Sequence, residues 1–227
     1  MMLAIQSGPE SILTRHRFFL LFVFLLATLI LFPYAEARHV GSYAFRVIGS
    51  FAIIVSVYAA NVHRGLLVFA IVLAIPALFE RIVLPEVHTH SFYIFNIVLT
   101  LVFDIVIVVV IFRHVLAEEQ PTSETIFGAL CLYLLVGFSF ANVYGLVAAF
   151  QPNAFYLDPR TNLHNVPDRF DFIYYSFCTM TSLGAAGITP VSSQARSFSI
   201  LEAILGVLYL AVLITGLIAA YRHNSSA

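Results

Sequence analysis

The chain alternates long apolar runs with short polar breaks, and the lengths of the runs predict helices that cross a membrane. Hydrocarbon about 30 Å thick needs roughly 17–25 apolar residues per helix. Six runs reach this length, so we expect an all-α membrane protein with six transmembrane helices. The six runs are Phe18–Ala35, Tyr43–Val62, Gly65–Pro85, Ser91–Phe112, Thr125–Phe150 and Ser197–Tyr221.

The segment between the last two runs follows a different pattern. Residues 151–169 are polar and contain three prolines, which is typical of a surface loop. Phe170–Thr181 is apolar and aromatic, but at about twelve residues it is too short to span. A stretch rich in glycine and alanine follows over Ser182–Gly187. Irregular backbone at membrane depth is tolerated only inside protein or beside a watery cavity, so this order predicts a re-entrant half-helix and a pore loop.

Composition agrees with a membrane location. Apolar residues make up 61% of the chain and charged residues 10%, whereas a soluble domain carries about 25% charged residues. We therefore expect the lipid bilayer to be the main partner of the chain. The net charge of -1 argues against binding to nucleic acid. Cys131 and Cys178 lie inside apolar runs, which favours two buried thiols over a disulfide.

The first run has a second interpretation. Phe18–Phe32 followed by Ala35-Glu36-Ala37 also resembles the apolar core and cleavage site of a signal peptide. The long leader before it contains Glu10, which favours a retained helix. All the positive charge is arginine, and it divides almost evenly between the two predicted sides. The positive-inside rule therefore does not fix the orientation.

The sequence contains no enzyme motif. G-x-S-x-G, H-E-x-x-H and a phosphate-binding loop are all missing, so we expect no catalytic residues and no cofactor. His88 and His90 beside Glu86 are too few ligands for a metal site, and no metal is expected. A secondary transporter is an alternative class, but it calls for a second broken helix in the first half, where Pro76 is the one candidate.

Three segments near the C-terminus follow one another in a recognisable order. They are Glu124–Leu135, Phe170–Pro190 (FDFIYYSFCTMTSLGAAGITP) and Ala195–Ile214. They resemble the outer helix, the pore helix with its filter, and the inner helix of bacterial potassium channels. The resemblance implies a pore domain over residues 121–227, preceded by a four-helix transmembrane region over residues 1–120. It also implies a homotetramer, because one chain supplies one pore loop. The resemblance further implies that both termini lie inside and that the protein is located in a bacterial inner (cell) membrane.

The filter departs from the family pattern Thr-Val-Gly-Tyr-Gly-Asp. After Thr181, the corresponding positions hold Ser182, Leu183, Gly184, Ala185, Ala186 and Gly187. Ala185 lacks the aromatic side chain, and Ala186 replaces a glycine where the family backbone is left-handed. Gly187 removes the outer carboxylate. We therefore expect a monovalent cation, potassium or sodium, to pass with weakened selectivity. Potassium-selective conduction is an alternative, as is a non-conducting subunit that assembles with a related channel subunit.

Other residues have expected roles in the same pore. Asp168 and Asp171 are the nearest acids to the outer mouth, where carboxylates concentrate cations. Glu202 is expected to brace the pore helix, with gating of the filter as the alternative. Gly206 and Gly216 are expected to be packing positions or gating hinges in the last helix.

The first four runs occupy the place of a voltage sensor but lack its charges. A voltage sensor needs several gating arginines inside the membrane, and only Arg113 follows the fourth run. We therefore expect no voltage sensing, and no cytosolic ligand-binding domain after Tyr221. Asp104 lies in mid-membrane, where a lone charge costs at least about 2.5 kcal/mol. We expect it to pair with Arg81 or Arg46, with a gating or proton-sensitive site as the alternative.

Overall fold

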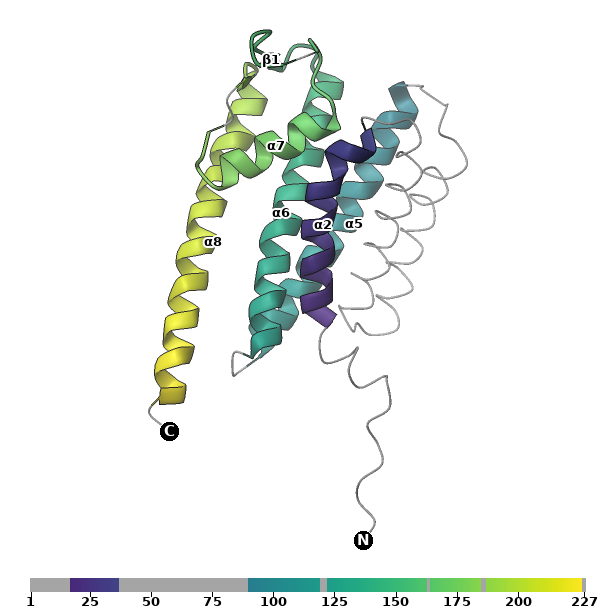
Figure 1. Cartoon of the computed structure of the whole chain (residues 1–227). Helices are drawn as coiled ribbons and strands as arrows, with labels where there is room; N and C mark the ends of the chain where they lie inside the picture. Colours follow the sequence, from purple (N-terminus) through teal and green to yellow (C-terminus); the bar gives the residue numbers. More distant parts are fainter. Residues whose placement is uncertain (1–16, 37–89, 119–121, 163, 185–186, 226–227) are drawn as a thin grey trace.

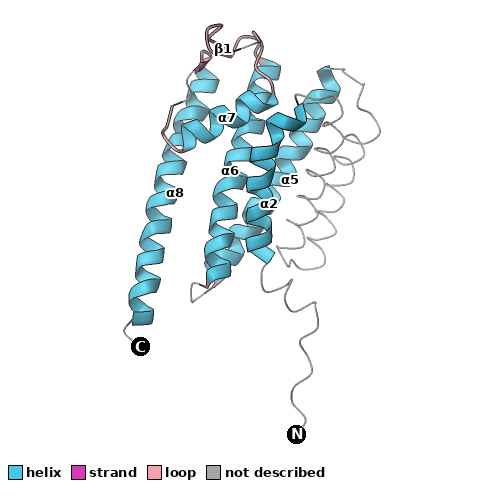
Figure 2. Ribbon diagram, viewed as in Figure 1, coloured by secondary structure: helices cyan, strands magenta, loops and turns pink. Residues whose placement is uncertain are grey.

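The computed structural model describes residues 17–36, 90–118, 122–162, 164–184 and 187–225. Within them the chain is mostly helical, with one short pair of strands (Figure 2). The elements, in order, are α2 (Arg17–Glu36), α5 (His90–Ala117), α6 (Ser123–Phe150), β1 (Phe155–Leu157), α7 (Arg169–Met180), β2 (Ile188–Pro190) and α8 (Ser193–Ser225).

The four long helices lie side by side, and α6 is the helix that the others share (Figure 1). α6 contacts α2, α5, α7 and α8. α7 is short and crosses obliquely between α6 and α8, nearer the end of the bundle at which β1 lies (Figure 1). The ends of α5 and α8 and the starts of α2 and α6 all lie at the opposite end.

The helices match four of the six predicted runs. Three of them are long and apolar enough to cross a membrane, at Tyr93–Ala117, Ser123–Phe150 and Ser193–Gly216. α2 has a shorter apolar stretch, Arg17–Leu31. The predicted runs at 43–62 and 65–85 lie outside the described residues. Three candidate spans are therefore established within the described part of the chain, and six are not.

The half-helix was predicted closely. Phe170–Thr181 was expected, and α7 covers Arg169–Met180, which is 12 residues. The all-α prediction, however, missed a small sheet. β1 and β2 pair antiparallel, with Phe155 opposite Pro190 and Leu157 opposite Ile188. Three residues are too few to show an alternating pattern, and the two strands lie far apart in the sequence, so no local signal indicates them.

The core has two parts that meet along α6. One lies between α2, α5 and α6 and includes Phe18, Ile107 and Cys131. The other lies between α6, α7 and the two strands and includes Tyr144 and Ile188. The strands therefore bury side chains against the half-helix, although the loop that carries β1 was predicted to be a surface segment.

Hydrogen bonds join α5 to α6 and α2 to α6. The side-chain amide of Asn142 on α6 donates to Oδ2 of Asp104 on α5 at 2.8 Å. The arginines predicted to pair with Asp104 lie outside the described residues. The backbone N–H of Phe18 donates to Oε2 of Glu124 at 3.0 Å, which ties the start of α2 to the start of α6. Cys131 and Cys178 are buried free thiols, as predicted.

The two glycines of α8 have different surroundings. A Cβ atom at Gly206 would overlap the carbonyl oxygen of Met180, the last residue of α7. Gly206 therefore allows α8 to pass close to the end of the half-helix, which is a packing role. A Cβ atom at Gly216 would meet nothing within 4 Å in the described part of the chain.

This difference predicts opposite effects of alanine on stability. Gly206→Ala is expected to destabilise the fold by about 1–3 kcal/mol because α8 and α7 must separate. Gly216→Ala is expected to be neutral or to stabilise by up to about 1 kcal/mol through helix propensity. Thermal unfolding in detergent, followed with a thiol-reactive dye that detects exposure of the two buried cysteines, measures both. Equal losses at the two positions would contradict the packing role of Gly206.

Candidate functional site

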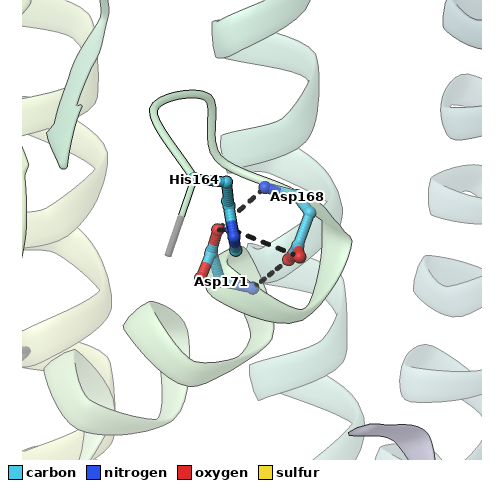
Figure 3. A group of neighbouring side chains, drawn as sticks. All are labelled: His164, Asp168 and Asp171. Atoms are coloured by element: carbon cyan, nitrogen blue, oxygen red, sulfur yellow. Dashed lines mark hydrogen bonds and ion pairs between the residues drawn. The ribbon is translucent and has the colours of Figure 1, made fainter. Parts of the chain in front are cut away.

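The start of α7 is fixed by two aspartates that cap it reciprocally. Oδ1 of Asp168 accepts from the backbone N–H of Asp171 at 2.8 Å, and Oδ2 of Asp171 accepts from the N–H of Asp168 at 2.9 Å. This is a capping box, and both negative charges lie at the positive end of the helix dipole. Nε2 of His164 lies 2.8 Å from Oδ2 of Asp171 and 3.4 Å from Oδ2 of Asp168 (Figure 3).

These three side chains could hold a metal ion, because their ligand atoms lie within 4.8 Å of one another. However, each carboxylate already accepts from a backbone N–H at the helix start. The hydrogen bonds therefore account for the cluster without an ion. Asp171 is also buried, at 8% exposure, and faces His164. Of the two acids expected at the outer mouth, Asp168 is the more exposed.

The end of α7 leads directly into the candidate filter, Thr181–Gly187. The N–H of Ser182 donates to the carbonyl of Thr179 at 3.1 Å, and the N–H of Leu183 to that of Cys178 at 2.9 Å. This pair of bonds is the Schellman pattern that closes a helix C-terminus. Ser182 therefore occupies the left-handed position of the motif, with φ at 59°. The inner end of the candidate filter is held by the last turn of α7.

The sign of the backbone angle φ alternates along the described residues Ser182, Leu183 and Gly184. Ser182 and Gly184 have positive φ, 59° and 81°, whereas Leu183 between them does not. Thr181, Ser182, Leu183 and Gly184 are all exposed in the single chain, and Leu183 is 77% exposed. Ala185 and Ala186 lie outside the described residues. The described part therefore presents a short irregular backbone on the outside of the chain, directly after a helix end.

The outer end of the candidate filter is held by the loop that follows β1. The carbonyl oxygen of Gly187 accepts from the N–H of Asp158 and from Nδ2 of Asn162, each at 2.9 Å. Ile188, the next residue, is 3% exposed and begins β2. The backbone of residue 187 is thus fixed by two hydrogen bonds and by the burial of its neighbour.

Glu202 on α8 is fully buried and joins three helices. The Tyr144 hydroxyl of α6 donates to Oε2 of Glu202 at 2.5 Å, and Oγ of Ser176 on α7 lies 2.5 Å from Oε1. Ser176 also lies 2.7 Å from the carbonyl of Gly137. A serine has one hydroxyl proton, so both of its contacts are hydrogen bonds when the carboxyl group of Glu202 carries a proton. A neutral acid is also the form whose burial costs least.

Aromatic rings pack beside this brace. Tyr144, Phe155, Phe172 and Tyr175 meet edge to face, with ring centroids 4.9–5.6 Å apart. The hydroxyl of Tyr175 lies 2.6 Å from Oγ of Ser199 on α8. The cluster contains residues from α6, β1 and α7, so it fixes the half-helix against α6 and β1.

Several supporting residues were not predicted from the sequence. Tyr144 and Ser176 are polar groups in apolar segments, and a polar group at membrane depth is a recognisable signal of a partner. Asp158 and Asn162 lie in a proline-rich loop that looked like an ordinary surface segment. No local pattern could have linked them to Gly187, because the contact depends on the return of the chain through β2.

Comparison with known proteins identifies the class. Residues 126–223 match a family model described as an ion channel. The match covers all of α7 and the candidate filter, and most of α6 and α8. No curated protein and no solved structure matches the chain. Residues 126–223 therefore form an ion-channel domain that resembles the potassium-channel pore. With three candidate spans as well, the chain is a multi-pass membrane protein, and its ion-channel domain agrees with the prediction that it is not an enzyme.

The hydrogen bonds of Glu202 predict which substitutions at this position lower the thermal stability most. Glu202→Gln keeps a neutral group that donates from one atom and accepts at the other, so its thermal stability should stay close to wild type. Glu202→Ala leaves Tyr144 and Ser176 without their partner and creates a cavity. It is expected to destabilise the fold by about 2–4 kcal/mol. The thiol-reactive dye described above measures both variants, and a glutamine variant as unstable as the alanine variant would argue against a protonated acid.

Proposed function

We propose that the protein is one subunit of a homotetrameric channel of a bacterial inner membrane that passes monovalent cations. The observation that carries the proposal is the half-helix α7, which lies in the chain between two candidate spans. It leads into exposed backbone in which the sign of φ alternates. The carbonyl end of a helix carries partial negative charge and favours cations. Stacked backbone carbonyls from four copies can then replace the hydration shell of an ion.

Two surfaces of the single chain support assembly with further copies. Irregular backbone at membrane depth needs protein or water around it, and Thr181–Gly184 is exposed among the described residues of one chain. In an 18-residue apolar stretch of the span Ser193–Gly216 only 11% is buried, against 44% in such a stretch of Ser123–Phe150. α8 therefore has apolar surface available for neighbouring subunits as well as for lipid. A related channel subunit could supply the same contacts, so subunit composition is an outcome of the test.

We further propose that potassium selectivity is weaker than the family pattern implies. Ala185 has no aromatic ring to pack behind the filter, and Ala186 stands where the pattern has glycine. The division into a four-helix region over residues 1–120 and a pore domain over residues 121–227 belongs to the same proposal. The tie between Phe18 and Glu124 offers one route by which the first region could influence the second.

Ion flux from proteoliposomes tests the channel itself. Purified protein should release both potassium and sodium, with permeabilities within about tenfold of each other, or about 1.4 kcal/mol in free energy. Native mass spectrometry of the same sample should give the mass of four chains. A strong preference for potassium would remove the claim of weak selectivity, and the absence of any monovalent cation flux would remove the channel.

Substitutions toward the family pattern test the filter assignment. Ala185→Tyr with Ala186→Gly is expected to raise the ratio of potassium to sodium flux, with each single variant as a control. Gly187 is left unchanged because a Cβ atom there would overlap Oγ1 of Thr161. A double variant that conducts with unchanged selectivity would show that residues 182–187 are not the filter.

A further inference from the structure

We propose that the outer end of the filter is held by a clamp, Asp158–Asn162, and that this clamp replaces the missing outer carboxylate in setting ion selectivity. The proposal rests on the channel function above. It assigns a positioning role to a loop in which the sequence indicated no function. Its argument comes from the contacts of Gly187.

The clamp holds one carbonyl from two directions. The oxygen of Gly187 accepts from the N–H of Asp158 and from Nδ2 of Asn162, both at 2.9 Å. Nδ2 of Asn162 also lies 3.0 Å from the carbonyl of Asp158, so the side chain is fixed to its own loop as well. A carbonyl with two donors has little freedom to rotate, and the backbone on either side of it is correspondingly restrained.

The loop Asp158–Asn162 is also held by hydrogen bonds within itself. The carbonyl of Asp158 accepts from the N–H groups of Thr161 and Asn162, each at 3.1 Å. Oδ1 of Asp158 accepts from the N–H of Arg160 at 2.9 Å. These bonds close a compact turn of five residues, so the two donors are already in position.

Glycine at position 187 is a requirement of this clamp. Its φ is 95°, a conformation that other residues rarely adopt. A Cβ atom would overlap Oγ1 of Thr161 and lie 3.0 Å from Nδ2 of Asn162. The side chains of the clamp therefore occupy the space that an aspartate at this position would need. An aspartate at position 187 and the clamp therefore exclude each other, because both need the same space.

The clamp acts at the end of the candidate filter that lies away from α7. The inner end is held by the last turn of α7, and Ile188 is buried after the outer end. Position 185, where the family pattern has a tyrosine, holds an alanine, which has no ring to pack behind the filter. Releasing Gly187 should therefore widen the outer filter and bring the potassium and sodium fluxes closer together.

Asn162→Asp is the direct test, and Asn165→Asp is its matched control. The first replaces the donating amide with a carboxylate oxygen that faces the carbonyl of Gly187. The second makes the same chemical change at an exposed position of the same segment. Asn162→Ala removes only the side-chain donor and keeps the Asp158 contact, so it serves where the aspartate variant fails to assemble.

Two measurements on the full chain separate the possible outcomes. Hydrogen exchange of the Asp158 amide, which donates to Gly187, should be about tenfold faster in Asn162→Asp than in wild type or Asn165→Asp. The ratio of potassium to sodium flux should move toward one in Asn162→Asp alone, with a smaller shift in Asn162→Ala. A purely structural contact would change exchange or stability without changing this ratio.

Different results would overturn the proposed clamp and the proposed channel function. A conducting wild type, together with an Asn162→Asp variant of unchanged exchange and unchanged flux ratio, overturns the clamp and leaves the channel. Faster exchange with an unchanged flux ratio overturns its role in selectivity. A wild type that passes no cation overturns the channel, and with it that role, whatever the exchange rates.

Discussion

Backbone polar groups inside a membrane need partners within the protein, and this constraint shapes the pore region. α7 ends before it could span, and the described residues directly after it, Thr181–Gly184, form neither helix nor strand. The inner end of this stretch is closed onto α7 through Cys178 and Thr179, and the outer end is closed onto Asp158 and Asn162. An irregular loop at this depth is possible because each end is held by a separate element.

The half-helix itself needs a fixed position, and buried hydrogen bonds supply it. Glu202 reaches Tyr144 and Ser176, so one carboxyl group sets α6, α7 and α8 relative to one another. Gly206, one helical turn further along α8, lets the same face pass the last residue of α7 closely. These two positions work together: the brace would be out of reach if α8 stood off from α7, and close packing alone would not fix the rotation of the helix.

The sequence allowed the helices and the half-helix to be predicted, but not the contacts that hold them. The length of the apolar run before Ser182 gave α7 to within one residue, because charge and apolar length act locally. The pairing of β1 with β2 and the clamp on Gly187 depend on segments that meet only after the chain has folded back. Glu202 was expected to brace the pore helix, yet its partners depend on the registers of two other helices. Those registers follow from side-chain packing, which no single segment encodes.

The effect of glycine at position 187, where the family pattern has aspartate, depends on the residues that surround it in the structure. Taken alone, glycine in place of the aspartate of the family pattern lacks a carboxylate, which predicts a weaker filter. In the structure, Thr161 and Asn162 occupy the space beside Gly187, and Asn162 donates to its carbonyl. The altered residue and the outer loop therefore form one unit, and restoring the carboxylate by itself would displace the loop. Ala185 and Ala186 differ from the pattern in the sequence, and they are the positions at which we expect selectivity to depend on the filter sequence itself.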